Sequence, residues 1–437
     1  MAEIQPFRGL RYDLAQVGNL ADVTAPPYDV ISPAMQDELY QKHPCNVVRL
    51  ILNRSEPGDE SDQDRYTRAA DFLRNWLSDG ILMQERDECI YAYDQEFDWE
   101  GQHYVRRGFM ARVRLEEFGT GQIFPHEETM SGPKADRLAL IQACRTGLSP
   151  IFGLYPDEAE QADGLLRGLT AGLTALETTD ELGVLHRMWP TSGREGINQL
   201  RDLLREKPVF IADGHHRYET ALNYRNWLRE TGELSPDDTT SPANFVLMHF
   251  VAMSDPGLAI LPTHRLVSGL PELPAADISE ILSPCFTIEE IGVGAEAAQQ
   301  TWEFIEADGG QAVFGLCSPT DGIWLLARLK DGSAMDEIAA DHSEAWRELG
   351  VSVLHSLVLG HLIGGLYPED EPQFKYVHRL SEVTEAVDGH TCELACLVPP
   401  ARIENVQQIA SGFEKMPPKS TYFYPKLLSG LVLNPLY

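Results

Sequence analysis

The five residues 213–217, read DGHHR, have the types and the spacing needed to hold an anion. They follow the apolar run 209–212, which predicts a buried strand, and they precede a stretch that predicts a helix beginning at His215 or His216. A helix N-terminus presents backbone N–H groups and the positive end of the helix dipole. The two histidines and the arginine would add donors in the same direction. The segment therefore predicts a phosphate or metal site, whereas Asp213 alone would be explained as an N-cap.

A metal ion is the second interpretation of the same segment. His215 and Glu219 are four residues apart, and His216 and Glu219 are three apart, so either pair would share one helix face. No HExxH motif is present, so a third zinc ligand would have to come from elsewhere. A Mg²⁺ ion that bridges bound phosphates would use Asp213 and Glu219.

A second group of chemically able residues lies in FPHEETMSGPKADRL. His126 and Glu127 are adjacent in a polar loop, and a carboxylate beside a histidine can act as a general base. Lys134 and Arg137 follow a Gly-Pro pair and could hold a transferring phosphoryl group. Only eight of the 35 basic residues are lysines, which favours a function for Lys134. The alternative is a solvated loop followed by an ordinary helix start.

Two further segments could contribute to a phosphate or nucleotide site. LPTHRLV places His264 and Arg265 at the end of an apolar strand, where ligands collect in α/β sheets. In EKMPPKSTYFYPKL, lysines alternate with aromatic residues, so charge and stacking could hold a nucleotide, with Lys419 and Lys426 as its main contacts. A surface His-Arg pair and an extended tail wrapped onto the core would explain the two segments equally well.

Both helices and strands must position these residues. Helical spacing predicts a helix over 71–77, and alternating aromatic and β-branched residues around the turn WEGQ predict a β-hairpin over 88–115. Residues 158–206 are predicted to be mostly helical, and 244–253 and 258–267 to be buried strands. In APPYDVIS, Asp29 or Ser32 could cap the following helix, and Arg49 is placed at the end of an apolar strand. The class is mixed α/β or α+β, with a ParB/sulfiredoxin-like core around DGHHR as the resemblance below implies.

We expect three regions. Residues 1–145 form an α/β region with the HEET loop, and residues 146–270 form the core with DGHHR and PTHR. Residues 271–437 form an α/β region with the lysine- and aromatic-rich tail. A chain of 437 residues is about three times the typical domain length of ~150 residues.

Composition excludes several classes of protein. The chain is 43% apolar, which rules out wholesale disorder, and its net charge is −32. A surface this acidic repels nucleic-acid phosphates and anionic lipids, so neither a nucleic acid nor a membrane is an expected partner. The seven cysteines form no CxxC pair, the N-terminus carries no secretory signal, and the most apolar window, 351–367, is too short to span a bilayer. We expect a cytoplasmic protein.

Six motifs carry a resemblance to a known family. They are APPYDVIS, HPCNVVRL, FPHEET with KADRL, ADGHHRYETAL, PTHRLV and MPPKSTYFYPK. In this order they resemble the domain-of-unknown-function family 1015 over nearly the whole chain. That family has no assigned activity, so the resemblance itself supplies no chemistry.

A more distant resemblance is more informative. The strand–DGHHR–helix segment is similar to the phosphate-binding box of the ParB, sulfiredoxin and free-serine kinase superfamily. It implies that Gly214, His215, His216 and Arg217 contact nucleotide phosphates and that Asp213 lies beside the transferred group. Sulfiredoxin has a reactive cysteine where His215 stands, so sulfinic-acid repair is not implied. The basic DNA-binding region of ParB is also missing.

These observations predict a nucleotide-dependent phosphotransferase that acts on a small hydroxylated metabolite, with free serine as one candidate. Arg217, His216 and the helix N-terminus would hold a nucleoside di- or triphosphate, and Mg²⁺ would bridge its phosphates. Glu127 or Asp213 would take the proton of the substrate hydroxyl. The side chains expected to neutralise the developing charge are Lys134 and His264.

Two alternatives remain open. The first is a regulatory module that binds a nucleotide without turning it over. The second is a metal-dependent hydrolase built on His215, Glu219 and His126.

Overall fold

The computed structural model describes residues 2–127 and 131–437, and the chain divides into two compact units. Unit 1 consists of Met1–Pro125, Thr129–Ala259 and Pro425–Tyr437, and unit 2 of His126–Glu128 and Ile260–Tyr424. In unit 1, strands from both sides of residue 145 belong to one sheet. The finer division after residues 145 and 270 stays a prediction.

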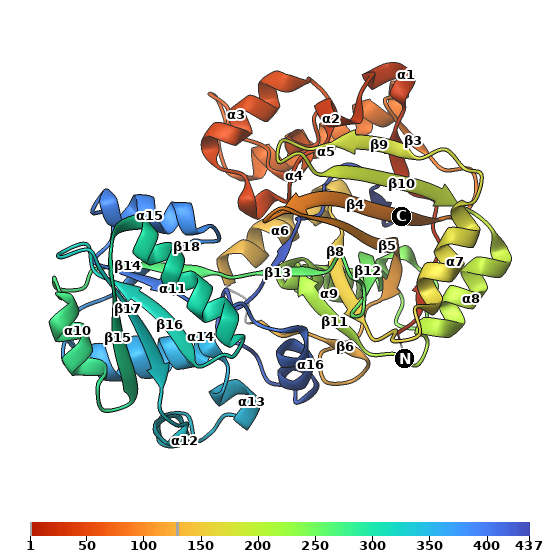
Figure 1. Ribbon diagram of the computed structural model, residues 1–437. Helices are drawn as coiled ribbons and strands as arrows, with labels where there is room; N and C mark the ends of the chain where they lie inside the picture. The colour runs from red at the N-terminus through yellow and green to blue at the C-terminus, as the bar shows by residue number, and fades with distance from the viewer. Residues whose placement is uncertain (1, 128–130) are drawn as a thin grey trace. The chain divides into compact units, whose positions relative to one another are not determined.

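Unit 1 is built on a nine-stranded sheet with the order β6-β11-β8-β12-β5-β4-β10-β9, in which β1 also pairs with β5. β11 runs parallel to β6 and β12 runs parallel to β8, while the other neighbours are antiparallel. This sheet and its helices confirm the mixed α/β class (Figure 1). The strands are β1 (Ile4–Gln5), β4 (Ile90–Trp99), β5 (Gln102–Arg114), β6 (Ile123–Phe124), β8 (Ile151–Tyr155), β9 (Leu176–Thr179), β10 (Leu185–Thr191), β11 (Val209–Asp213) and β12 (Phe245–Ala252).

The predicted hairpin is the pair β4 and β5, and the prediction is confirmed. Its turn residues, Glu100 and Gly101, have φ angles of 50° and 77°. Two successive left-handed residues make a tight turn whose twist matches that of the strands. Alternate apolar residues of both strands, including Ile90, Phe109 and Val113, lie in the core of unit 1.

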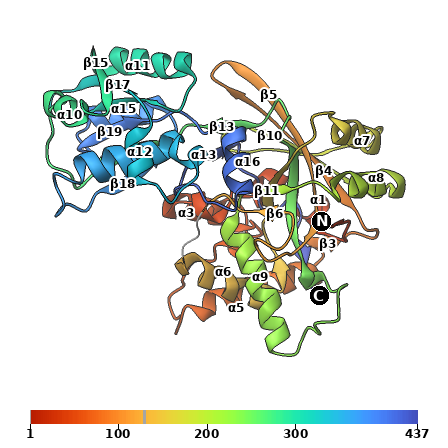
Figure 2. The same cartoon turned by 90° about the horizontal axis from the view of Figure 1, so that it is seen from below.

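The helices of unit 1 pack in two groups. α6 contacts both α5 and α9 (Figure 2), and α7 lies beside α8 (Figure 1). Ser32 Oγ accepts a hydrogen bond from Met35 N at 3.2 Å, so Ser32 caps the helix that follows APPYDVIS. The helices are α1 (Leu14–Val17), α2 (Leu20–Val23), α3 (Pro33–Lys42), α4 (Val48–Ile51), α5 (Gln63–Ser78), α6 (Ser131–Cys144), α7 (Gln161–Thr170), α8 (Arg194–Leu204) and α9 (His215–Glu230), with 3₁₀ turns η1 (Tyr28–Val30) and η2 (Pro242–Asn244). Two small sheets pair β2 (Leu10–Tyr12) with β3 (Leu82–Gln84) and β7 (Thr146–Gly147) with β21 (Asn434–Pro435).

Three local predictions are wrong. The segment 158–206 contains β9 and β10 between its two helices, because β10 pairs with β4 along its whole length. Arg49 lies in the short helix α4 rather than on a strand, and its Nη2 donates to Tyr40 O at 2.8 Å. The predicted strand 258–267 is broken at Pro262, which has no N–H for a sheet. It forms β13 (Ala259–Leu261) and β14 (His264–Ser268), so His264 and Arg265 begin a strand instead of ending one.

Unit 2 has its own antiparallel sheet, with the order β15-β17-β16-β19-β14-β18. Its core includes Trp302, Trp324 and Leu397. The remaining strands are β15 (Phe286–Val293), β16 (Val313–Cys317), β17 (Ile323–Leu329), β18 (Gln373–Val377), β19 (Leu394–Leu397) and β20 (Tyr422–Tyr424). The helices are α10 (Ala275–Leu282), α11 (Gly294–Asp308), α12 (Ser333–Ile338), α13 (Glu344–Arg347), α14 (Gly350–Ser352), the π-helix η3 (Val353–Ile363), α15 (Leu380–Asp388) and α16 (Ile403–Ser411). Across residues 2–127 and 131–437, no helix has the length and apolar character required to cross a bilayer.

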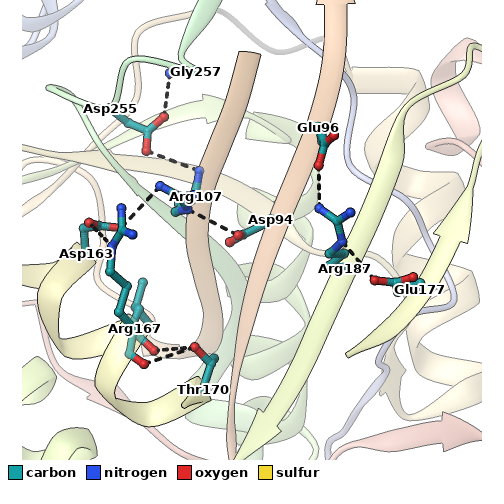
Figure 3. Close-up of polar contacts among 11 residues, drawn as sticks. Asp94, Glu96, Arg107, Asp163, Arg167, Thr170, Glu177, Arg187, Asp255 and Gly257 are labelled. Carbon is teal, nitrogen blue, oxygen red and sulfur yellow. Dashed lines mark hydrogen bonds and ion pairs between the residues drawn. The ribbon is translucent and has the colours of Figure 1, made fainter. Parts of the chain in front are cut away.

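Arg107 of β5 lies among three carboxylates of unit 1 (Figure 3). Its Nε is 3.3 Å from Asp94 Oδ2, its backbone N donates to Asp255 Oδ2 at 3.2 Å, and its Nη1 is 3.9 Å from Asp163 Oδ1. The Arg107 guanidinium does not compensate for the burial of Asp94. Burial raises the pKa of Asp94 from 3.8 to about 6, even though Arg107 acts in the opposite direction.

We predict that Asp94→Asn stabilises the protein at pH 7.5. Since the pKa of Asp94 is higher in the folded state than in the unfolded chain, the folded state binds more protons between pH 4 and pH 6, and stability falls as the pH rises through that window. The neutral amide avoids this loss, so the free energy of unfolding at pH 7.5 should increase by about 3 kcal/mol. Denaturant titrations at pH 4 and pH 7.5 measure the effect, which should vanish at pH 4. The control is Asp98→Asn, whose side chain is 82% exposed and should show no such change; a destabilised Asp94→Asn at pH 7.5 would refute the explanation.

Candidate functional site

The turn between β11 and α9 places DGHHR as the sequence predicts. Val209, Phe210 and Ile211 are buried in the sheet, the strand ends at Asp213, and the helix begins at His215. Gly214 joins them with φ 92° and ψ 29°, a left-handed conformation that favours glycine. A Cβ at this position would lie 2.9 Å from Arg217 Nε. Both the backbone and the Arg217 side chain therefore require glycine here.

The N-cap of α9 is Gly214, which corrects the assignment of that role to Asp213. Because glycine has no side chain, the N-cap residue cannot itself satisfy the N–H groups of the first turn. Helix N-termini that bind phosphate commonly begin after a glycine in this way. His215 is buried and His216 is partly exposed. The turn thus has the backbone geometry of an anion site.

Asp213 is instead the centre of an ion-pair group. Its Oδ2 accepts from Arg217 Nη2 at 2.9 Å, and its Oδ1 is 3.7 Å from Lys426 Nζ. Arg217 also donates to Pro150 O. The three charged side chains carry a net charge of +1, and each is at most 19% exposed. A partly buried positive charge at a helix N-terminus favours an anionic ligand.

Two residues that the sequence analysis missed hold Lys426 in place. Gln95 Nε2 on β4 donates to Lys426 O at 3.0 Å, and Arg106 Nη2 on β5 donates to Pro425 O at 2.5 Å. Arg106 also donates to Gln95 Oε1, and both side chains are completely buried. Burial lowers the pKa of Arg106 to about 10, so it stays protonated at neutral pH. A sequence signal could have identified these two residues. They are polar, and they occupy positions of the hairpin strands whose other side chains are apolar and face inward.

The other predicted residues of unit 1 lie on α6 and α9. Lys134 forms an ion pair with Glu219. The Arg137 guanidinium lies over the Tyr28 ring, 4.1 Å from its centroid, and bonds to Asp136. Both carboxylates of the predicted metal pair, Asp213 and Glu219, therefore already have cationic partners. Within the described ranges, no three His, Cys, Asp or Glu side chains meet in a way that could hold a metal ion.

Arg137 and Arg217 line one cavity in unit 1, together with Tyr28 of the APPYDVIS motif. Its volume is about 70 Å³. Burial raises the pKa of Tyr28, so its phenol is protonated at neutral pH. No sequence pattern indicates this cavity, because its walls come from segments far apart along the chain.

Three of the predicted residues meet in unit 2. Glu127 Oε1 accepts from Lys419 N at 2.7 Å, and Arg265 Nη2 donates to Lys419 O at 2.9 Å. Lys419 has a left-handed φ of 58°, which is a strained backbone conformation. The two hydrogen bonds hold its backbone N–H and its backbone C=O in that conformation. It takes part through its backbone, whereas we expected its ammonium group to act. Glu128 and Thr129 of the same loop lie outside the described residues.

His264 is neutral. It is 1% exposed, and burial lowers its pKa to about 3. Its Nδ1 accepts a hydrogen bond from Val398 N at 3.3 Å. A neutral imidazole cannot supply the positive charge that we expected of His264, because it remains unprotonated at any physiological pH. Of the two side chains predicted to neutralise the developing charge, only Lys134 keeps that role.

We predict that Gly214→Ala destabilises the protein more than Gly232→Ala does. Both glycines have left-handed φ angles, 92° and 78°, so both substitutions carry a backbone cost of about 1 kcal/mol. Only at Gly214 does the new Cβ also meet the Arg217 guanidinium, since no described atom lies within 4 Å of a Cβ at Gly232. Denaturant titrations of the two variants isolate the contact. Equal losses would mean that Arg217 is not held against the turn.

Comparison with known proteins gives one family and a set of distant structures. No curated protein sequence matches the chain. A mutant of free serine kinase in complex with AMP has 10% identity and a TM-score of 0.34, with 69% of this chain and 84% of that chain covered. A conserved hypothetical protein from Pyrococcus furiosus has 12% identity and a TM-score of 0.32, with 69% and 87% covered.

SbnI from Staphylococcus aureus, with a C-terminal truncation, has 9% identity and a TM-score of 0.33, with 73% and 85% covered. Likeness at this level leaves the activity to be argued from the chain's own residues. A family model matches residues 4–352, which contain five of the six motifs, and MPPKSTYFYPK lies beyond the matched residues. The chain belongs to the family described as proteins of unknown function, DUF1015.

Proposed function

We propose that the protein is a nucleotide-dependent phosphotransferase that acts on a small hydroxylated metabolite. The observation that carries the proposal is the turn between β11 and α9, where Gly214 opens a helix N-terminus beside Arg217 and Lys426. Phosphoryl transfer requires chiefly the positioning and neutralisation of phosphate charge. Backbone N–H groups and two cations around a left-handed glycine are suited to that task.

Each residue of the turn has a proposed role. The first turn of α9 and the side chains of Arg217, His216 and Lys426 hold the nucleotide phosphates. Lys134 would balance the charge that develops during transfer. Mg²⁺ is held by one or two carboxylates together with phosphate oxygens, so Asp213 would be its protein ligand only if another carboxylate is the base. Bound in this way, Mg²⁺ would neutralise charge on the transferred group.

The transfer also needs a proton acceptor. The substrate hydroxyl oxygen forms a bond to the terminal phosphorus, the bond from phosphorus to the departing nucleotide oxygen breaks, and the hydroxyl proton passes to a carboxylate. Asp213 and Glu127 are the two bases that the sequence predicts, and of these only Asp213 belongs to the same unit as the turn. Asp213 accepts a hydrogen bond from the charged Arg217 side chain, whereas Glu127 Oε1 accepts one from the backbone N of Lys419.

One observation favours the alternative of binding without turnover. Arg217 and Lys426 both form ion pairs with the Asp213 carboxylate, so both of its oxygens already have partners. A nucleotide-binding regulatory module would need no base at all. The metal-dependent hydrolase has no comparable support, because the described chain offers no cluster of metal-binding side chains.

We predict that a nucleotide with Mg²⁺ raises the melting temperature of the wild-type protein and not that of Arg217→Ala. A ligand that binds only the folded state stabilises it by about 2.7 kcal/mol at a concentration 100 times its Kd. The measurement is a thermal-shift screen against ATP, ADP, CTP and GTP. Arg187→Ala is the matched control, since Arg187 pairs with Glu96 and Glu177 on the sheet (Figure 3) and should leave the shift intact. The same shift in Arg217→Ala, or none with any nucleotide, contradicts the proposal.

We predict that removing the base abolishes transfer but spares binding. Asp213→Asn and Glu127→Gln are assayed for nucleotide consumption with a set of hydroxylated metabolites that includes serine. The true base should lower the rate by about 10²- to 10⁴-fold while the nucleotide thermal shift persists. A wild-type protein that binds a nucleotide and consumes none would establish the regulatory alternative instead.

A further inference from the structure

The cavity beside the DGHHR turn has apolar walls. It lies within unit 1 and is lined from α6, from α9 and from the segment 146–149. α6 and α9 lie side by side in Figure 2. The apolar side chains that line it include Ile51, Leu140, Ile141, Leu148 and Ala221. A cavity with these walls favours an aliphatic group over a fully polar one.

One hydroxyl in this cavity has no partner. Thr220 lines the cavity and is 3% exposed, and its Oγ1 forms no hydrogen bond with any described residue. A threonine in a helix can bond to the carbonyl one turn earlier, as Thr301 does to Ala297 O at 2.7 Å. The Thr220 hydroxyl does not form this bond to a backbone carbonyl. Because a buried polar group without a partner is costly, its hydroxyl is suited to a ligand in the cavity.

Two arginines line the same cavity. In the described chain, Arg217 uses two of its N–H groups, for Pro150 O and Asp213, of the five that a guanidinium has. In the described chain Arg137 uses three of its five N–H groups, for Asp136 and Ile51 O, and its guanidinium stacks on Tyr28, which also lines the cavity. The cavity therefore combines apolar walls, one buried hydroxyl and two cationic groups that can receive a carboxylate.

The cavity has a volume of about 70 Å³ and is partly open. A space with this lining suits a small molecule that carries a short branched aliphatic chain.

We propose that this cavity binds the acceptor, and that the acceptor is a small hydroxy acid with a short aliphatic chain. Its aliphatic part packs against Leu140 and Ala221, its carboxylate faces the two arginines, and Thr220 Oγ1 hydrogen-bonds to a polar group of the ligand. This assignment rests on the proposed phosphotransferase activity and narrows its substrate class. It also disfavours free serine, whose polar side chain would leave the apolar walls unfilled.

The test is a calorimetric titration of the full-length protein with 2-hydroxy-3-methylbutanoate and, separately, with serine. We expect the branched hydroxy acid to bind at least about 10-fold more tightly. Thr220→Val keeps the shape and removes the hydroxyl, so it should weaken binding about 10-fold without lowering the melting temperature. The matched control is Thr178→Val on β9, because Thr178 Oγ1 is likewise buried and has no partner in the described chain; its binding should equal that of the wild type.

A second variant, Ala221→Leu, fills the cavity and should abolish binding of the hydroxy acid while the nucleotide thermal shift remains. If this variant fails to fold, Thr220→Val decides the question alone. Serine binding as tightly as the branched acid, no acid binding at all, or unchanged binding by Thr220→Val would overturn the proposal. The two proposals fail separately. Hydroxy-acid binding without any nucleotide shift removes the phosphotransferase and leaves the cavity as a hydroxy-acid site with no acceptor role. A nucleotide shift without acid binding removes only the cavity assignment.

Discussion

The site depends on one backbone constraint, which is that strand β11 becomes helix α9 through a single left-handed residue. Gly214 turns the chain with a φ of 92°, and a side chain there would collide with the Arg217 guanidinium. Since the turn is this short, residues 213 and 217 face each other, and Arg217 pairs with Asp213 at 2.9 Å. The same turn leaves the first turn of α9 without a capping side chain from its N-cap residue. The turn at Gly214 therefore accounts both for the backbone geometry of the anion site and for the position of the Arg217 charge.

The hairpin β4/β5 binds the C-terminal segment that carries Lys426. Gln95 and Arg106 are polar and completely buried, and their hydrogen bonds go to the backbone carbonyls of Lys426 and Pro425. Buried polar groups are tolerated when they are satisfied in this way, and such networks fix one arrangement. Here the fixed arrangement is a Lys426 ammonium near Asp213. The C-terminal segment of the chain is thus part of the site on account of two residues in an early hairpin.

Local sequence signals were sufficient for much of this structure. An apolar run followed by Asp-Gly predicted β11 and the start of α9, and alternation around WEGQ predicted the hairpin. The prediction of helix over 158–206 was wrong because pairing with β4 outweighed local preference at β10. The local sequence favoured an N-cap role for Asp213. Its ion pair with Lys426 could not be predicted, because the two residues are far apart in sequence. The cavity beside Thr220 was out of reach for the same reason, because no local pattern records which distant side chains line it.

The central claim is that the turn at Gly214 binds the phosphates of a nucleotide. A calorimetric titration of the full-length protein with pyrophosphate and Mg²⁺ tests it most directly, because pyrophosphate carries neither base nor ribose. The account predicts saturable binding that Lys426→Ala weakens about 10-fold, as expected for the loss of one charge-assisted contact to phosphate. Absence of pyrophosphate binding, or equal affinity in Lys426→Ala, would contradict it.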